Sequence, residues 1–197
     1  MVMPSRFDAA TRAIDAANAT DPRTEQVDGI TQPKELIYAR RMSACLLRIY
    51  PQASETLQIA ARAQHLCRWQ ILRSSYPLGR DGYNAWRTAC RQHHADSVAE
   101  ILCSLGYARM EIQRVQNVIK KNDLKTDSES QALENVVGVV FVEFYLDAFL
   151  ADHAAYDEAK LTGILKKTFR KMDGTGHDAI LDLPLESSKR SMIAAAM

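Results

Sequence analysis

The sequence predicts an all-α protein, and three observations support that prediction. Glycine (8 residues) and proline (6 residues) are sparse in a chain of 197 residues, whereas sandwiches of short strands need many turn residues. Apolar residues make up 47% of the chain, which suffices for a hydrophobic core. They recur at three- and four-residue steps, the spacing of one face of an α-helix. We therefore expect a single helical domain of about seven or eight helices over residues 5–184, followed by a flexible tail over residues 185–197.

The first helix is expected to begin after Ser5, whose hydroxyl is a good N-cap, and to stop near Asn18. Residues 20–32 are polar and contain Pro22 and Gly29, both typical of loops. This segment is therefore predicted to be a long loop.

The second helix is expected to start with Thr31 as its cap and Pro33 in its first turn, because proline is tolerated where no backbone N–H is needed. Pro51 ends that helix. A third helix is expected from Ser54 through Leu66.

The segment SSYPLGRDG breaks the helical pattern, and its proline and glycines predict a structured loop. A fourth helix should run from about Tyr83 to Leu105, with Gly106 as its left-handed C-terminal residue. The apolar spacing from Met110 to Ile119 predicts a fifth helix.

The segment from Leu133 to Ala148 predicts a central helix buried on nearly all sides, because apolar residues lie on both of its faces. Its sequence VVGVVFVEFYL also has strong strand propensity. The length of the segment and its helical neighbours favour a helix. Leu161–Phe169 predicts a further helix with a basic outer face.

The positive charge of the chain is concentrated between Ala61 and Ala95. This stretch holds six arginines and three of the five histidines of the chain, but a single acid, Asp81. Both tryptophans lie there, although the net charge of the whole chain is only +1. Guanidinium groups bind phosphate and carboxylate through paired hydrogen bonds, and aromatic faces stack on planar ligands. The stretch therefore predicts a binding site for an anion, most plausibly a phosphate.

The candidate ligand-binding residues come from this stretch: Arg68, Trp69, Arg73, Tyr76, Arg80 and Arg87. The arginines would hold the anion, and the aromatic residues would stack on a base or ring. In the alternative interpretation, the arginines pair with acids on helix surfaces and the aromatic rings pack in the core.

The candidate catalytic residues are His65, His94 and Glu134. An imidazole acts as an acid, a base or a metal ligand near neutral pH. Glu134 lies on the apolar central helix, where a carboxylate needs a partner. The alternative for both histidines is a buried polar contact in a helical core. His93 is expected on the exposed side of its helix, about 100° away from His94.

Several sequence blocks resemble an uncharacterised family, known only as a domain of unknown function and sometimes automatically labelled glutamyl-tRNA synthetase. The matching blocks are RFDAA, PKELIYARRM, ARAQH with the following RW, RSSYPLGRDGY and LKTD with the following LE. The resemblance covers about residues 5–184. The sequence has no HIGH-like or KMSKS-like motif and no nucleotide-binding strand–helix alternation, so it gives the synthetase label no support.

At a greater distance, the helix order resembles the HD metal-phosphohydrolase superfamily, which places histidines and aspartates around a metal. His65 matches the histidine of the His-Asp pair and Leu66 its aspartate, while His94 matches an additional histidine borne on a helix. Tyr38 and Asn135 stand where such proteins carry a histidine and an acid, so three of the four core ligand positions are altered. The resemblance implies an HD-like bundle, with a divalent metal ion at His65 and His94 as the cofactor.

Other features of the chain exclude several classes of protein. No apolar run of about 18 residues predicts a transmembrane helix. The N-terminal segment carries acids and lacks the apolar core of a secretory signal. The four cysteines are scattered singly, which favours reduced thiols in the cytoplasm over a disulfide framework or a zinc knuckle.

These features predict a cytoplasmic protein that binds, and as an enzyme would hydrolyse, a phosphorylated small molecule or nucleotide. The alternatives are a non-catalytic module that binds nucleotides or RNA, and an interaction protein whose basic stretch meets an acidic partner. RNA binding would depend steeply on salt, whereas a small ligand in a pocket would not.

Overall fold

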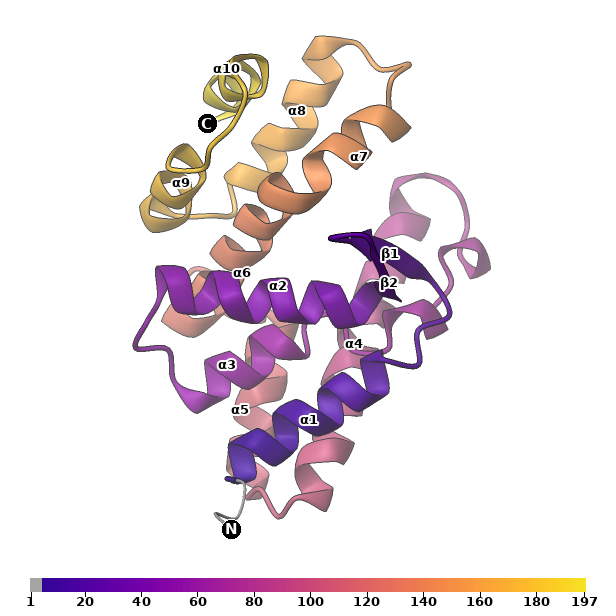
Figure 1. Cartoon of the computed structure of the whole chain (residues 1–197), viewed down its shortest axis with the longest axis vertical. Coiled ribbons are helices and arrows are strands. Elements are labelled where there is room, and N and C mark those ends of the chain that lie inside the picture. The colour runs from indigo at the N-terminus through magenta and orange to yellow at the C-terminus, as the bar shows by residue number, and fades with distance from the viewer. Residues whose placement is uncertain (1–4) are drawn as a thin grey trace. The chain divides into compact units, whose positions relative to one another are not determined.

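The computed structural model describes residues 5–197 and consists almost entirely of α-helices (Figure 1). The described residues form ten α-helices and one two-stranded antiparallel sheet. The all-α prediction is confirmed, although there are more helices than the seven or eight expected. The chain clusters into two compact units, divided between Asp123 and Leu124, and the single domain expected from the sequence stays a prediction.

The first unit contains five α-helices, one hairpin and two short 3₁₀ turns. In chain order these are α1 (Arg6–Asn18), β1 (Thr24–Val27), β2 (Ile30–Pro33), α2 (Lys34–Ile49), α3 (Glu55–Arg62), η1 (Arg68–Gln70), η2 (Arg73–Ser75), α4 (Gly79–Ser104) and α5 (Arg109–Lys120).

Helix α1 begins and ends where the sequence predicts. The Ser5 hydroxyl accepts a hydrogen bond from the Asp8 backbone N–H, and the Asp8 carboxylate accepts one from the Ser5 N–H. This reciprocal pair satisfies two of the backbone donors that every helix start leaves unpaired.

The predicted loop over residues 20–32 is instead largely a β-hairpin, in which Val27 pairs with Ile30 across the turn. Asp28 and Gly29 form that turn with φ angles of 51° and 78°. Tight hairpin turns need positive φ at both central residues, and Asp-Gly is a strong sequence signal for them. The polar composition of the segment obscured this signal.

The predicted start of the second helix at Thr31 is wrong, because β2 continues through Pro33 and α2 begins at Lys34. Pro33 takes the N-cap position and supplies no side-chain cap. Instead, the Asp21 carboxylate accepts a hydrogen bond from the Glu35 backbone N–H, with Oδ2 3.1 Å from the nitrogen. A residue distant in sequence thus satisfies the start of α2.

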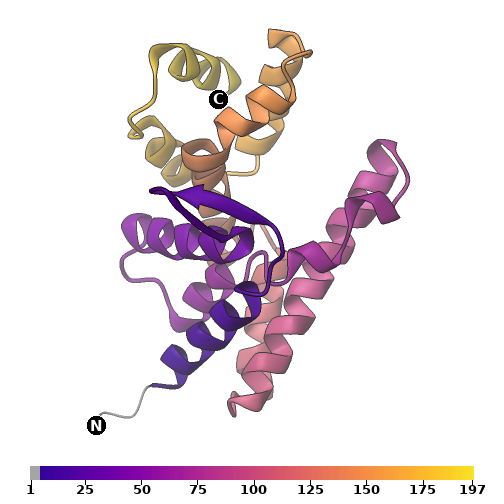
Figure 2. The same cartoon turned by 45° about the vertical axis from the view of Figure 1, so that its right-hand side comes forward.

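Helix α3 ends at Arg62, four residues before the predicted Leu66, and α4 begins at Gly79, four residues before the predicted Tyr83. Consequently, His65 lies in a turn between helices. Gly106 has a φ angle of 76°, which confirms its predicted left-handed conformation after α4. Figure 2 shows the long α4 antiparallel to α5, with the N-terminal turns of α4 extending beyond α5.

The core of the first unit is formed by large apolar side chains that are at most 1% exposed. Each helix of this unit contributes one or more of them, including Ile14, Met42, Ile59, Leu102 and Ile119. Complete burial of one such side chain stabilises a fold by about 1.5–3 kcal/mol. Helices α1 to α5 therefore share one hydrophobic core.

The second unit contains α6 (Ser128–Val140), η3 (Phe141–Tyr145), α7 (Leu146–Asp152), α8 (Glu158–Phe169), α9 (Gly174–Leu181) and α10 (Ser187–Ala196). Leu133, Val139, Leu165 and Phe169 are almost completely buried in its core. The predicted helix over Leu161–Phe169 is confirmed as part of α8.

The predicted central helix is interrupted by η3, a single turn of π-helix. The prediction of burial on nearly all sides holds up to Val142 and fails beyond it, since Phe144 is 41% exposed while Leu146 is buried. A π-turn contains one residue more than an α-turn, so the residues after it move around the helix axis.

Amide side chains of α6 hold the start of α9 in the second unit. Asn135 Nδ2 donates to Asp173 Oδ1 at 2.8 Å, and Asn135 Oδ1 accepts from the Asp173 backbone N–H at 3.1 Å. Gln131 Nε2 donates to the same Asn135 oxygen and to the Lys171 carbonyl. A Cβ on Gly176 would lie 2.7 Å from the Asn135 side chain, so glycine is needed for this close approach.

Residues 187–196, which were expected to belong to a flexible tail, form α10 and pack on α8. Ile193 and Ala196 are 1% exposed, and Lys189 Nζ lies 2.5 Å from Asp147 Oδ1. These two buried apolar residues are three positions apart and therefore lie on one face of α10, where they pack against the rest of the second unit. Across residues 5–197, no helix has the length and hydropathy needed to cross a membrane.

Candidate functional site

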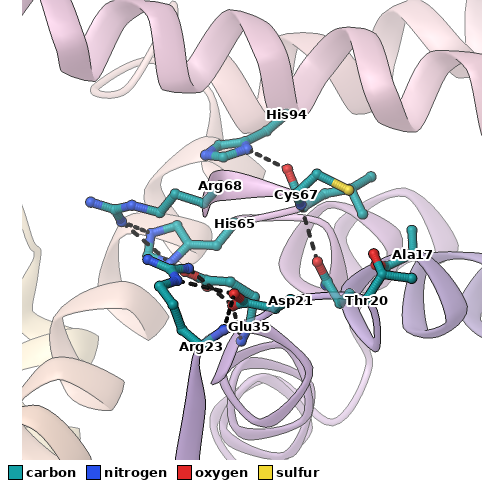
Figure 3. A network of polar contacts seen from close by, with 11 residues as sticks. Ala17, Thr20, Asp21, Arg23, Glu35, His65, Cys67, Arg68 and His94 are labelled. Carbon is teal, nitrogen blue, oxygen red and sulfur yellow. Dashed lines mark hydrogen bonds and ion pairs between the residues drawn. The ribbon is translucent and has the colours of Figure 1, made fainter. Parts of the chain in front are cut away.

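A tight turn after α3 places His65 and Arg68 side by side. The Arg68 backbone N–H donates to the His65 carbonyl, and Cys67 takes a left-handed conformation with a φ angle of 53°. The Cys67 N–H donates to Asn18 Oδ1 at 3.1 Å, which ties the turn to the end of α1 (Figure 3). Because the chain reverses here, the side chains of His65 and Arg68 meet.

The imidazole of His65 lies between a guanidinium, a carboxylate and an aromatic ring. Arg68 Nη1 is 2.6 Å from His65 Nε2 and 3.3 Å from His65 Nδ1, and Glu35 Oε2 is 3.3 Å from His65 Nδ1. The ring of Tyr38 stacks on the imidazole at 3.9 Å with an angle of 11° between the planes. Three contacts therefore fix the position of this imidazole.

Two buried carboxylates and one arginine support this arrangement from the base of the hairpin. Arg23 donates to both oxygens of Asp21 at 3.0 Å and to Glu35 Oε1 at 2.8 Å (Figure 3). Asp21 and Glu35 are each 4% exposed. Buried carboxylates need such partners, since desolvation of an unpaired charge is costly.

His94 reaches the site from the middle of α4 and is 2% exposed. Its Nδ1 lies 2.8 Å from the Leu66 carbonyl oxygen, which makes Nδ1 the protonated nitrogen and leaves a lone pair on Nε2. In Figure 3, Nε2 points to the side on which the Arg68 guanidinium lies. The rings of His65 and His94 are 5.8 Å apart. A backbone carbonyl that fixes the tautomer is typical of functional histidines.

Both imidazoles are held in the neutral form. Burial lowers the pKa of His94 to about 3, and His65 beside it acts in the same direction. Burial also lowers the pKa of His65 well below its usual range. Positive charges lower it further, and these belong to Arg68, Lys121, Arg23 and Arg87. Four positive charges therefore act on His65, and Arg23 among them is paired with the carboxylates of Asp21 and Glu35. We call Arg23, Glu35, His65, Arg68 and His94 the histidine–arginine cluster.

The loop after η2 is held by hydrogen bonds from side chains, and one predicted ligand-binding residue, Arg73, donates two of them. Arg73 Nη1 donates to the carbonyls of Tyr76 and Pro77, each at 3.0 Å. Trp86 Nε1 donates to the Ile71 carbonyl at 2.9 Å. A Cβ on Gly82 would lie 2.0 Å from the Pro77 oxygen, so this position requires glycine.

The structure brings together three of the predicted site residues, namely His65, Arg68 and His94. The Arg68 guanidinium lies 4.9 Å from the ring of Trp86, and Arg87 lies 5.8 Å from the ring of Tyr83. This arrangement places aromatic rings next to the cluster.

The other predicted residues lie elsewhere. Arg73 and Tyr76 belong to the loop, and Trp69 is half-buried in η1. Arg80 is exposed in the first turn of α4, without a hydrogen bond or ion pair to the part of the chain that the structure describes. Glu134 is 6% exposed and belongs to α6 of the second unit.

Sequence reasoning missed the acidic side of the site. Asp21 and Arg23 fall in the segment predicted to be a loop, and Glu35 stands in the first turn of α2, where an acid also favours the helix dipole. The Asp-Gly turn was the available signal, because a hairpin brings the residues before and after it together. It would have placed Arg23 near Lys34, whose N–H donates to the Arg23 carbonyl.

Buried polar atoms near the turn lack partners among residues 5–197. These atoms are Asn18 Nδ2, Gln64 Oε1 and His93 Nε2. His93, which was expected to be exposed, is half-buried, and its ring lies 6.0 Å from that of His94. Gln64 directly precedes His65, so unsatisfied hydrogen-bonding capacity remains beside the cluster.

The described residues offer a poor set of metal ligands. No three His, Cys, Asp or Glu side chains among them are grouped to hold a metal ion. Arg68 Nη1 lies within 3.3 Å of both ring nitrogens of His65, so a divalent cation bound to this imidazole would lie beside a positive charge. This arrangement does not fit a metal ion, and the metal at His65 and His94 stays a prediction.

A separate cleft lies among α1, α2 and α3. Its volume is about 260 Å³, and Phe7, Leu46, Leu47 and Arg62 are among the residues that line it. None of the predicted site residues lines it. Arg62, at its edge, donates two hydrogen bonds to Asp15 at 2.7 and 2.5 Å.

Fold and site together define a helical protein with a histidine–arginine cluster in its first unit. The model of a family described as Domain of unknown function (DUF4202) matches residues 8–193, and the chain belongs to this family. No curated protein and no solved structure gives a significant match to the chain.

Proposed function

We propose that the first unit binds a phosphorylated small molecule at the histidine–arginine cluster, with nucleotides as the preferred class. The observation that carries the proposal is the guanidinium of Arg68, held 2.6 Å from His65 Nε2, with the positive charges of Arg87 and Lys121 also acting on His65. A guanidinium has five N–H donors, so the contact with His65 leaves donors for a phosphate.

The aromatic rings beside Arg68 support a nucleotide as the ligand. Trp86 lies against the Arg68 guanidinium, and the ring of Tyr83 is 5.8 Å from that of Trp86. Tyr83 is 45% exposed and offers a face on which a base can stack. Trp86 is tied into the loop, so Tyr83 is the better stacking candidate of the two.

His94 supports hydrolysis of a phosphoester by a degenerate HD-like phosphohydrolase. Its neutral Nε2 lies inside a buried site and can accept a proton from an attacking water. The HD-like arrangement of ligands remains part of this proposal, while Glu134, on α6 of the second unit, stays a prediction from the sequence. The resemblance of His65 and His94 to HD-superfamily positions supports it.

Binding without catalysis is the second candidate function. It is favoured by the contacts of His65, because Arg68 Nη1 lies within 3.3 Å of both ring nitrogens and Glu35 Oε2 lies 3.3 Å from Nδ1. In this version, His65 fixes Arg68 and takes no part in chemistry. A non-catalytic module of this kind would bind either a nucleotide or RNA.

The test is a calorimetric titration of the purified protein, once with inorganic phosphate and once with a nucleoside monophosphate. We expect saturable binding of both ligands, with tighter binding of the nucleotide. Arg12→Ala is the matched control, because Arg12 is an exposed arginine of α1 outside the cluster. Phosphate and nucleotide that fail to bind well-folded wild-type protein would contradict the proposal.

Two further measurements separate the candidates. Release of phosphate from phosphoesters, abolished in His94→Gln, would support the hydrolase, whereas binding without release supports the module. A steep fall in affinity with salt for single-stranded RNA would identify RNA as the ligand. Metal analysis of protein purified without chelator tests the sequence-based prediction of a metal. Stoichiometric metal that is lost in His65→Ala and in His94→Ala would support that prediction and contradict the poor fit of the ligand set.

A further inference from the structure

Four side chains of α4 form a stripe along one face of the helix. They are Arg80, Tyr83, Arg87 and His94, which follow one another at steps of three, four and seven residues. At about 100° per residue, these steps keep all four within an arc of about 60°. The stripe is about 21 Å long, since each residue adds about 1.5 Å to a helix. We call these four residues the α4 stripe.

The acids of α4 all lie away from the α4 stripe. They are Asp81, Asp96 and Glu100. Each of them lies about 120° or more around the helix axis from His94. Within the stripe, the Arg87 guanidinium lies 5.8 Å from the ring of Tyr83. This face of α4 therefore suits a ligand that carries both negative charges and planar rings.

The α4 stripe passes from solvent into the histidine–arginine cluster. Its outer residue, Arg80, is exposed and makes no hydrogen bond or ion pair within residues 5–197. Tyr83 is 45% exposed, Arg87 is half-buried, and His94 is 2% exposed. The outer end belongs to the N-terminal turns of α4, which extend beyond α5 (Figure 2). A long ligand can thus place one end in the cluster and the rest on exposed helix surface.

A mononucleotide uses only the inner part of the α4 stripe. With its phosphate at Arg68 and its base on Tyr83, it ends about one helical turn short of Arg80. A strand that continues past this base carries further phosphates towards the outer end. The unpaired guanidinium of Arg80 is suited to such a phosphate.

We propose that the ligand of the first unit is the phosphorylated end of a single-stranded nucleic acid, with its terminal phosphate at Arg68 and its following nucleotides along the α4 stripe. This inference rests on the proposed function and names the ligand class of that site. Tyr83 stacks on a base, which a single strand offers and a duplex keeps within its own stack. An acidic peptide matches the charges of the stripe but need not carry a ring for Tyr83.

The experiment is a calorimetric titration that compares a nucleoside monophosphate with a single-stranded tetranucleotide. The tetranucleotide carries a phosphate at its 5′ end, at its 3′ end or at neither. Known single-strand-binding folds cover about four nucleotides or more. We expect one of the phosphorylated forms to bind at least about tenfold more tightly than the monophosphate and the unphosphorylated form, because it adds charge-assisted contacts at both ends of the stripe.

Arg80→Ala tests the outer end of the stripe. It should weaken binding of the phosphorylated tetranucleotide about tenfold and that of the monophosphate far less. The slope of log affinity against log salt should become shallower by about 0.7, the contribution of one phosphate contact on a single strand. Arg109→Ala is the matched control, because Arg109 is likewise an exposed arginine in the first turn of a helix, α5. Its affinity and its salt slope should equal those of the wild type.

Equal affinity of the wild type for the monophosphate and the phosphorylated tetranucleotide would overturn this inference and leave the proposed function standing. Equal affinity with and without the terminal phosphate would contradict its placement at Arg68. Equal behaviour of Arg80→Ala and Arg109→Ala would remove the stripe from the binding site.

Two further outcomes separate the inference from the proposed function. A glutamate oligopeptide that binds as tightly as the tetranucleotide would identify an acidic protein partner and overturn the nucleic-acid ligand. Binding of the tetranucleotide that is lost in Arg80→Ala, without any binding of inorganic phosphate or the monophosphate, would support the stripe while the proposed function fails.

Discussion

Each unit has a polar network that joins elements distant in sequence. The two networks differ in how many of their hydrogen-bonding groups have partners within the network. In the second unit, the Asn135 amide and the Asp173 carboxylate and N–H pair with one another reciprocally. In the first unit, arginines outnumber carboxylates around His65, and the Nε2 lone pair of His94 points into the site. The first network therefore has hydrogen-bonding capacity for a ligand, whereas the second holds the fold together.

The largest effect is expected from breaking the second network. Asn135→Leu leaves the Asp173 carboxylate and N–H without their partner and should lower the free energy of unfolding by about 2–4 kcal/mol. Urea denaturation measures this change. Asn84→Leu, at an exposed position of α4, is the control and should change stability by less than about 0.5 kcal/mol. An equal effect of the two substitutions would contradict the structural role of Asn135.

The first network should make stability depend on pH. The pKa of His94 is about 3 in the folded protein and 6.5 ordinarily, so the unfolded chain binds a proton first as the pH falls. Stability is complete above pH 6.5 and should fall below it by up to about 1.4 kcal/mol per pH unit from this group. Urea denaturation at pH 7, 6 and 5 measures the slope, and His94→Gln should flatten it. An unchanged slope in this variant would contradict the burial of a neutral His94.

Arg68→Ala tests which network binds the ligand. It should weaken the binding of inorganic phosphate at least tenfold, about 1.4 kcal/mol, because the guanidinium supplies the charged donors. Calorimetric titration measures the loss, and Arg12→Ala is the control. Arg80→Ala tests the sequence-based hypothesis that the loop closes on the anion. A loss of binding in Arg80→Ala alone would move the site from the cluster to the loop.

The smallest effect is expected at the turn that joins His65 to Arg68. Cys67 has a φ angle of 53°, which glycine adopts without a steric penalty. Cys67→Gly should therefore raise the free energy of unfolding by about 0.5–1 kcal/mol, because it relieves the left-handed strain and keeps the backbone hydrogen bond to Asn18. Thermal unfolding measures the gain. A loss of stability would show that the Cys67 side chain contributes more than the strain costs.

The all-α fold and helix α1 could be predicted because local signals decide them. Ser5 caps α1 through residues within one turn, and apolar spacing marks the buried faces of α2, α4 and α5. The start of α2 could not be predicted in this way, because its cap is Asp21 across the hairpin. Contacts between residues distant in sequence leave no local periodicity.

The candidate site was predicted in part for the same reason. The density of arginine and histidine pointed to His65, Arg68 and His94, which the structure brings together. It also pointed to Arg73, which instead binds carbonyls of its own loop. Glu35 was missed, since an acid in the first turn of a helix already has a local explanation.

The π-turn at Phe141–Tyr145 has the form of a one-residue insertion into an otherwise continuous helix. The five residues of the π-turn turn the chain about as far around the helix axis as four residues of an α-helix do. A chain shortened by one residue here could therefore close the turn as α-helix and keep Leu146 in the core. In a regular α-helix, the same deletion would rotate all following residues by about 100°. Related chains should therefore tolerate a one-residue deletion at this turn better than elsewhere in α6 and α7.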